Sequence, residues 1–293
     1  MESKIAKALK MKLNPVAIIF SNKKPENALQ FKEGKWGCVM WLFASAAKGK
    51  TAVFDRNTYG CWGGAVGLGF GNKYLEFLGG IDCFYYFLSS GNKNWDKGKA
   101  IAENIKPFVT KEFYEDFLEG ERYLKSPELV KKFVEKLPIT EVPAEYVIFK
   151  PLKEVILKEE RPIVIVFPVN SHQLSALVFL ANYERENFEN VIVPWGAGCQ
   201  TIGIFAYKEA NSDLPKAVLG LTDPSARKQV RKYLGDNIFT FTLPFNFFNE
   251  LEQNVEGSFL ERSTWQALSD KDNNTSKTAK HTEKLDNKQD VTN

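Results

Sequence analysis

Hydrophobic positions in this chain fall into short runs that turn signals separate. Ile5, Leu9 and Leu13 recur at helical spacing within residues 2–13, and Asn14-Pro15 ends that pattern. Runs rich in β-branched and aromatic residues predict strands at Val16–Phe20, Thr51–Asp55, Tyr146–Phe149, Ile163–Phe167, Val191–Val193, Ala217–Leu221 and Phe239–Leu243.

Between residues 73 and 136 the hydrophobic period is helical. Glycine pairs and Ser126-Pro127 divide this stretch into segments. The predicted helices are Tyr74–Leu78, Cys83–Leu88, Ala100–Phe108, Lys111–Leu118 and Pro127–Leu137, followed among the later strands by Ser171–Tyr183, Gln200–Tyr207 and Ser225–Leu234. Helices alternating with strands predict an α/β, more broadly a mixed α+β, fold.

A weak internal repeat organises this alternation. Pro15–Phe20 is similar to Pro162–Phe167, and Gly37-Cys38 and Gly198-Cys199 follow, each opening an apolar helix that precedes a strand. The order strand, Gly-Cys, helix, strand thus occurs twice, although chance similarity is an equal alternative. We predict one domain over 1–268 with two pseudo-repeated lobes, about 1–125 and 126–268, a helical insert between the copies and a site between the lobes.

The end of the chain differs in composition from the rest. Residues 269–293 contain only Ala279, Leu285 and Val291 as hydrophobics, which predicts a disordered polar tail. The whole chain has 293 residues, 44% of them hydrophobic, and a net charge of +3. So small a charge gives no reason to expect nucleic acid, and no apolar stretch approaches the roughly 18 residues of a membrane span. We predict a cytoplasmic protein without membrane or nucleic-acid partners and leave its oligomeric state open.

The cysteines are the first candidates for chemistry. The chain has four, Cys38, Cys61, Cys83 and Cys199, and no export signal that would favour disulfides. Cys199 follows a strand and a glycine turn at a predicted helix start, where backbone N–H groups lower the pKa of a thiol and favour a nucleophile or metal ligand. Burial as a small apolar side chain is the alternative. Cys83, among aromatic residues, is predicted to be a core residue.

Cys61 lies in a segment crowded with glycine. Six of the chain's 20 glycines fall between Gly60 and Gly71. This concentration predicts a loop whose backbone approaches something closely or adopts positive φ. The spacing is not that of a dinucleotide-binding fingerprint. We predict that Gly60, Gly63, Gly64 and Gly198 contact a cofactor or ligand, with a tightly packed loop as the alternative.

Arg227 follows the helix-start sequence Asp223-Pro224-Ser225-Ala226. Asp at the N-cap and Pro at the first helical position explain these residues structurally. The alternative is that Arg227 binds a small acidic ligand.

Taken together, these segments resemble domain-of-unknown-function family 169, a group seen in archaea and anaerobic bacteria. The resemblance covers most of residues 13–268. It rests on Asn14–Ala17, Gly37-Cys38, Tyr59–Gly64, Phe87–Gly91, Gly198-Cys199, Asp223–Arg227 and Leu243–Phe245. It implies that Cys38, Cys61 and Cys199 belong to a shared pattern, whereas Cys83 and the tail are particular to this chain. The family's name states no activity.

Three hypotheses follow. The leading one is that Cys38, Cys61 and Cys199 bind an iron–sulfur cluster or another thiolate-bound metal, although the spacing lacks close Cys pairs. The second is an enzyme or redox protein that uses Cys199 as a thiolate, for which no base is visible. The third is a module that binds a small acidic ligand without catalysis. Whether the protein is an enzyme stays open.

Overall fold

The computed structural model describes residues 1–269, and its centre is one mixed sheet. The seven strands lie in the order β2-β3-β1-β4-β7-β6-β5, antiparallel except for the β5–β6 pair. They are β1 (Val16–Ser21), β2 (Ala52–Phe54), β3 (Tyr146–Pro151), β4 (Val164–Val169), β5 (Val191–Ile192), β6 (Ala217–Gly220) and β7 (Phe239–Pro244). The predicted mixed α+β class is confirmed.

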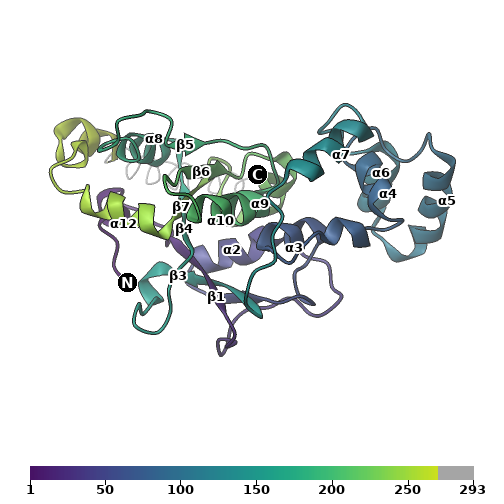
Figure 1. Cartoon of the computed structure of the whole chain (residues 1–293), viewed down its shortest axis with the longest axis horizontal. Helices are drawn as coiled ribbons and strands as arrows, with labels where there is room; N and C mark the ends of the chain where they lie inside the picture. The colour runs from purple at the N-terminus through teal and green to yellow at the C-terminus, as the bar shows by residue number, and fades with distance from the viewer. Residues whose placement is uncertain (270–293) are drawn as a thin grey trace, which may run out of the picture.

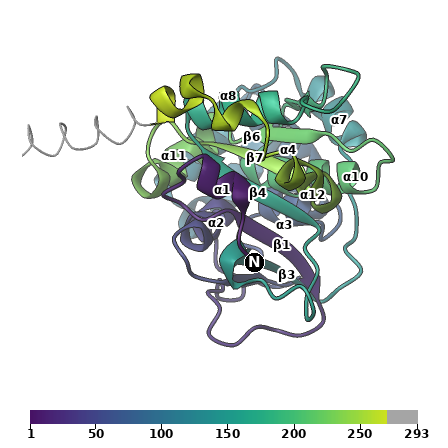
Figure 2. The same ribbon diagram turned by 90° about the vertical axis from the view of Figure 1, so that its left-hand side faces the viewer.

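Helices cover both faces of the sheet (Figures 1 and 2). In chain order they are α1 (Lys4–Ala8), α2 (Val39–Ala47), α3 (Trp62–Leu68), α4 (Ile81–Phe87), α5 (Asp96–Ile105), α6 (Lys111–Glu119), α7 (Pro127–Lys136), α8 (Ser171–Leu180), α9 (Gly198–Ile202), α10 (Ile204–Ala210), α11 (Pro224–Leu234) and α12 (Phe245–Gln253). Short 3₁₀ turns include η1 (Lys73–Glu76).

The two faces of the sheet bury separate cores. Alternate residues of a strand point to opposite faces, so Val16 and Ile18 of β1 join one core and Ala17 and Ile19 the other. The first core lies under α2, α3, α9, α10 and α11 and continues into α4–α7. The second lies under α1, α8 and α12. All three candidate metal-binding cysteines belong to helices on the first face.

The sheet extends to both sides of the central β1–β4 pair. Outward from that pair, it reads β1-β3-β2 on one side and β4-β7-β6-β5 on the other, so the second side has one strand more. The sheet is continuous, and β3 pairs with β1 and β2 although it follows residue 126 in the chain. The internal repeat and the lobe boundary at 125/126 stay predictions.

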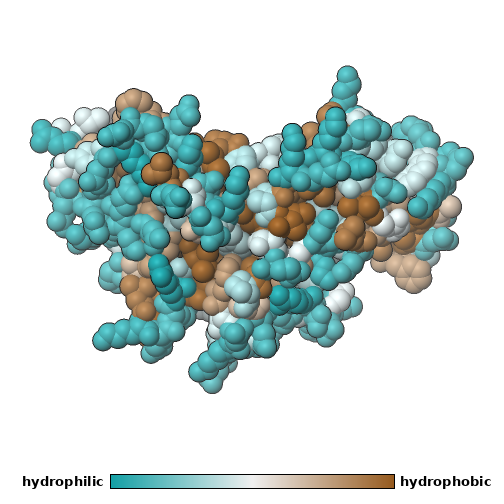
Figure 3. Space-filling view, viewed as in Figure 1, coloured by the Kyte–Doolittle hydropathy of each residue, from teal (hydrophilic) through white to brown (hydrophobic). Residues whose placement is uncertain are grey.

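Helices α4–α7 form an insert that extends from one end of the molecule (Figure 1). The chain enters and leaves it through adjacent segments, since the N–H of Gly71 donates to Thr140 O and the N–H of Val142 to Gly69 O. Phe133 of α7 packs edge-to-face on Trp195, with ring centroids 4.3 Å apart. Figure 3 shows apolar surface at the junction of the insert and the sheet body.

One prediction of local structure was wrong. The segment from Gly60 to Gly71 is not a loop throughout, because α3 runs through Gly63, Gly64 and Gly67 and ends at Gly69 in the left-handed region. Helix propensity disfavours glycine, but close packing of α3 on its neighbours compensates here. Most other predicted strands and helices appear within a few residues of their expected bounds.

Two predictions concern the chain ends and membranes. The predicted tail lies, from residue 270 onward, outside the described residues. Within residues 1–269, no helix has both the length and the apolar character needed to cross a membrane.

Candidate functional site

Three helices on the first face of the sheet begin at cysteines. Cys38 is the N-cap of α2, Cys61 is the N-cap of α3, and Cys199 is the second residue of α9. Cys38 and Cys61 are half-buried and Cys199 is buried. The structure therefore gathers cysteines that are far apart in the sequence, and we refer to Cys38, Cys61 and Cys199 as the thiol cluster.

Glycines let the backbones of these helix starts touch one another. A Cβ on Gly60 would lie 2.3 Å from Gly37 O, next to Cys38. A Cβ on Gly67 of α3 would lie 2.7 Å from the carbonyl carbon of Cys199, and one on Gly203 would meet Gly67 O. The predicted close approach of backbone is therefore real, but its partner is another helix.

Gly64 and Gly198 likewise allow neighbouring helices to pack closely. A Cβ on Gly64 would lie 2.7 Å from Val39 Cγ2, and one on Gly198 would lie 3.3 Å from Met40 Cγ. Gly63 is different, because the nearest atom to its Cβ would be Tyr74 OH at 3.7 Å. Contact between Gly60, Gly63, Gly64 or Gly198 and a ligand stays a prediction.

Two of the thiols hydrogen-bond to the same peptide group. The N–H of Gly64 donates to Cys61 Sγ at 3.2 Å, and Cys199 Sγ–H donates to Gly63 O at 3.2 Å. The N–H and C=O of a trans peptide point in opposite directions, so the sulfurs lie at its two ends. Cys199, as a donor here, carries its proton.

Burial raises the pKa of all three thiols. The pKa of Cys38 rises to about 12, through burial first and then the neighbouring Cys61. Burial raises the pKa of Cys199 too, with further increases from Cys61 and Cys38, and raises that of Cys61. The expectation that a helix start lowers the pKa of Cys199 was wrong, because loss of water outweighs the backbone N–H groups.

Asp223 joins α11 to the helix that carries Cys199. Its carboxylate accepts from the N–H of Gly198 at 2.6 Å and from the N–H of Ala226 at 2.7 Å. Burial raises the pKa of Asp223, while these hydrogen bonds and Arg227 oppose the increase. The predicted N-cap is confirmed, and it also positions the start of α9.

Glu121, from the turn between α6 and α7, brings a second carboxyl to the start of α11. Ser225 Oγ donates to Glu121 Oε1 at 2.8 Å, and Tyr123 OH lies 2.7 Å from Ser225 Oγ. Burial raises the pKa of Glu121 to about 7, and the acids Asp116 and Asp223 act in the same direction. The charge of Glu121 in turn raises the pKa of Cys61.

Tyr74 of η1 is joined to the helix of Cys199 by a hydrogen bond. Its hydroxyl accepts from Gln200 Nε2 at 2.8 Å, and both side chains are buried. Burial, then Cys199, Cys61 and Glu121, raise the pKa of Tyr74. Tyr74 OH would also lie 3.7 Å from a Cβ on Gly63, the residue whose carbonyl accepts from Cys199.

The site is built from acids. Cysteine, tyrosine, aspartate and glutamate all become negative when they lose a proton, and here Cys61, Asp223 and Glu121 each raise the pKa of at least one other acid. Among the described residues, the charges that act most strongly on the thiols are those of other acids, and the nearby Arg227 acts on Asp223.

A preformed metal centre is not supported. Across residues 1–269, no three or more His, Cys, Asp and Glu side chains are arranged to hold a metal ion. The thiols instead use backbone partners, as Cys61 and Cys199 do at the Gly63–Gly64 peptide. Cys83 lies apart in α4, fully buried, where it would meet a Cβ on Gly79.

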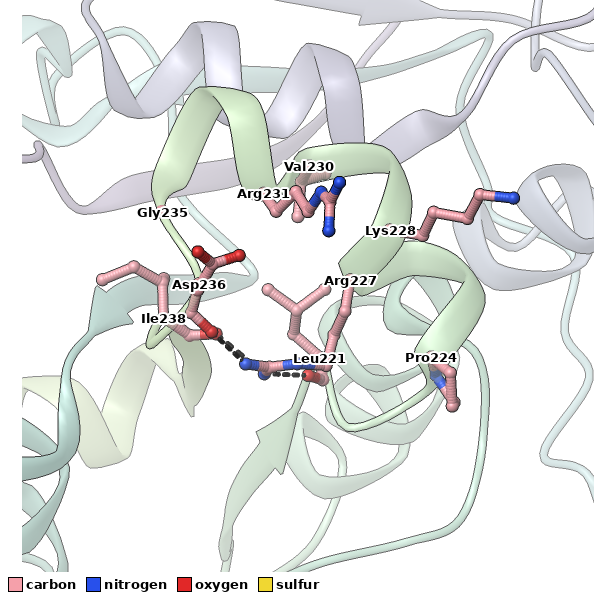
Figure 4. A pocket seen from close by; sticks show the side chains of 9 residues that line it. All are labelled: Leu221, Pro224, Arg227, Lys228, Val230, Arg231, Gly235, Asp236 and Ile238. Atoms are coloured by element: carbon pink, nitrogen blue, oxygen red, sulfur yellow. Dashed lines mark hydrogen bonds between the residues drawn. The ribbon is translucent and has the colours of Figure 1, made fainter.

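Arg227 lies beside a cavity of about 340 Å³ on the other side of α11 (Figure 4). Its guanidinium donates to Leu221 O and Ile238 O, each at 3.1 Å, and to Asp236 O, and it packs over the ring of Phe239. These bonds fix the turns at both ends of α11. Binding of an acidic ligand by Arg227 stays a prediction, and most of its donors already have protein partners.

Sequence reasoning missed four polar residues of this site. Glu121, Ser225, Tyr74 and Gln200 lie at ordinary loop or helix positions, and nothing in their spacing links them to the cysteines. The sequence Asp223-Pro224-Ser225 was interpreted only as a helix start. A partial signal was present at Gln200, which follows the Gly-Cys pair directly.

Comparisons with known proteins identify a family and nothing further. The model of domain-of-unknown-function family 169, described as uncharacterised ArCR, matches residues 4–254. No curated protein and no solved structure matches the chain.

Proposed function

Because the chain belongs to domain-of-unknown-function family 169, whose description states no activity, we propose a function from the thiol cluster: Cys38, Cys61 and Cys199 bind a metal ion or an iron–sulfur cluster as thiolates. The observation that carries this proposal is the kind of group gathered at the site: thiols and carboxyls are neighbours there, and the charged groups that act on the thiols are other acids.

A cation is the ligand that this arrangement favours. Each thiol keeps its proton at neutral pH because burial and neighbouring acids oppose a negative charge. A metal ion reverses that balance, since it is the largest local charge and deprotonates the thiols that coordinate it. An acidic ligand would add to the unfavourable negative charge instead.

The same raised pKa values disfavour a cysteine nucleophile. A catalytic thiol needs a lowered pKa or an adjacent base. Cys199 has a raised pKa, and its hydrogen-bond partner is a carbonyl, which cannot accept a full proton. Metal binding requires Cys199 to rotate away from Gly63 O.

The test is anaerobic purification of the full chain, followed by metal and sulfide analysis and absorption spectra. We expect stoichiometric metal with thiolate charge-transfer bands. Single replacements Cys38→Ser, Cys61→Ser and Cys199→Ser should each lower metal content at least fivefold, and Cys83→Ala is the matched control that retains it.

Other outcomes reject the proposal. A metal-free protein that also takes up no added Co²⁺, Zn²⁺ or Fe²⁺ would overturn it. Loss of metal at only one of the three positions would reject the three-thiolate site.

A further inference from the structure

The cavity beside α11 is separate from the thiol cluster, and no cysteine lines it. It has a volume of about 340 Å³ and lies between α11 and the two chain segments that flank this helix (Figure 4). Leu221 precedes the helix, and Gly235, Asp236 and Ile238 follow it. Pockets that bind small molecules span roughly 300–1,000 Å³, so this cavity has room for a small ligand.

Part of the cavity wall is apolar and fixed in shape. Leu221 and Val230 are 1% and 2% exposed, and Ile238 is half-buried. Leu221 has a φ of 57°, in the left-handed region, and its carbonyl accepts from Arg227 Nη1 at 3.1 Å. The same guanidinium donates to Ile238 O at 3.1 Å. Arg227 thus fixes the positions of two wall residues, and the wall suits the aliphatic part of a ligand.

Arg231 and Asp236 bring opposite charges to the cavity without pairing with each other. In Figure 4 the guanidinium of Arg231 and the carboxylate of Asp236 face the space that the lining residues enclose. Within residues 1–269, neither group has a hydrogen bond or an ion pair with another side chain or with the backbone. Both residues are exposed, so a ligand from solvent can reach them.

The charges around the cavity select the class of ligand. Arg227, Lys228 and Arg231 outnumber the single carboxylate of Asp236, so a simple cation is disfavoured. A simple anion would meet the Asp236 carboxylate, and Lys228 already pairs with Glu112. A molecule with both an anionic and a cationic group can pair with Arg231 and Asp236 at once.

From this arrangement we infer that the cavity binds a small aliphatic amino acid. The carboxylate of the ligand pairs with Arg231 and its ammonium group pairs with Asp236. Its side chain packs on the apolar wall of Leu221, Val230 and Ile238. The inference is independent of the proposed metal site, which lies at the other side of α11.

The experiment is a ligand-observed NMR titration of the full chain with L-leucine. We expect saturable binding with a Kd below about 1 mM. Two analogues test the two charges of the ligand, because isocaproate lacks the ammonium group and isoamylamine lacks the carboxylate. Each should bind at least tenfold more weakly than L-leucine, since each leaves one charge of the cavity without its partner.

Two variants assign each charge of the ligand to a residue. Arg231→Gln should lower the affinity for L-leucine at least tenfold and change that for isoamylamine little. Asp236→Asn should lower the affinity for L-leucine at least fivefold without weakening the binding of isocaproate. The replaced groups have no partners within the described residues, so both variants should melt at the wild-type temperature.

Lys232→Gln is the matched control. Lys232 is an exposed base of the same helix, and it does not line the cavity. The control removes the same charge as Arg231→Gln, and it should bind L-leucine as the wild type does. Cys199→Ser should also retain wild-type binding, so failure of the metal site and failure of this inference are distinguishable.

Four results would overturn the inference. The first is the absence of saturable L-leucine binding up to roughly 10 mM. The second is wild-type affinity in Arg231→Gln, and the third is an equal loss of affinity in Lys232→Gln. The fourth is binding of isocaproate as tight as that of L-leucine, which would exclude a role for Asp236 and with it the amino acid class.

Discussion

Helix α11 separates two regions with opposite electrostatics. At its first turn lies the thiol cluster with Asp223 and Glu121, where thiols and carboxyls gather. Along its other side lies the cavity of Arg227, Lys228 and Arg231, where bases predominate. A charged cavity is the more conventional candidate for a ligand site.

The two regions differ in the hydrogen-bond and ion-pair partners that their side chains have within the protein. Arg227 donates to three backbone carbonyls, and Lys228 pairs with Glu112. At the start of α11, by contrast, the partners are neutral groups: Cys61 and Cys199 hydrogen-bond to one backbone peptide, and Glu121 accepts from the Ser225 hydroxyl.

The largest expected effect tests the glycine contacts that assemble the thiol cluster. Gly67→Ala should lower the free energy of unfolding by about 2–4 kcal/mol, because its Cβ would overlap the backbone of Cys199, which cannot move aside. Gly63→Ala, in the same helix with its nearest neighbour at 3.7 Å, should be neutral or stabilise by up to about 1 kcal/mol. Urea denaturation compares the two, and similar values would contradict the proposed packing.

The second prediction tests the structural role of Arg227. Arg227→Met should lower the free energy of unfolding by about 2–4 kcal/mol, because the carbonyls of Leu221, Asp236 and Ile238 lose a charged donor. Arg231→Met, at the same cavity, should change it by less than about 0.5 kcal/mol. Equal stability of both variants, measured by urea denaturation, would show instead that Arg227 is free for a ligand.

The third prediction concerns pH. The pKa of Glu121 is raised from 4.5 to about 7 by burial, so the folded chain binds a proton more tightly than the unfolded chain. The stabilisation that protonated Glu121 contributes is fully present below its ordinary pKa of 4.5 and is lost as pH rises through its folded pKa of about 7. Asp116 and Asp223 also raise the pKa of Glu121, and the hydrogen bond from Ser225 lowers it.

Glu121→Gln removes this titration. Relative to the wild type, the variant should be similar in stability near pH 4 and more stable near pH 8, by at most roughly 3 kcal/mol. Urea denaturation of metal-free protein at both pH values measures the difference. A difference that does not change between pH 4 and pH 8 would show that Glu121 is ionised freely in the folded chain.

Sequence patterns predicted most helices and strands because the signals for these elements lie in neighbouring residues. β4 follows from the β-branched run that begins at Ile163, and α11 from Asp223-Pro224. The segment of α3 was wrongly predicted as a loop because glycine has low helix propensity, and the packing that outweighs this cost comes from Gly203 and Cys199, more than 100 residues away.

For the candidate site, the sequence by itself determined the residue types: three cysteines at glycine-flanked positions and an aspartate N-cap. Tertiary structure decided that the helix starts carrying these cysteines pack together, that burial raises the pKa values of the thiols, and that Glu121 and Tyr74 are coupled to them. The physical reason is that helix and strand signals depend on neighbouring residues, whereas burial and charge coupling depend on groups that only the folded chain brings close.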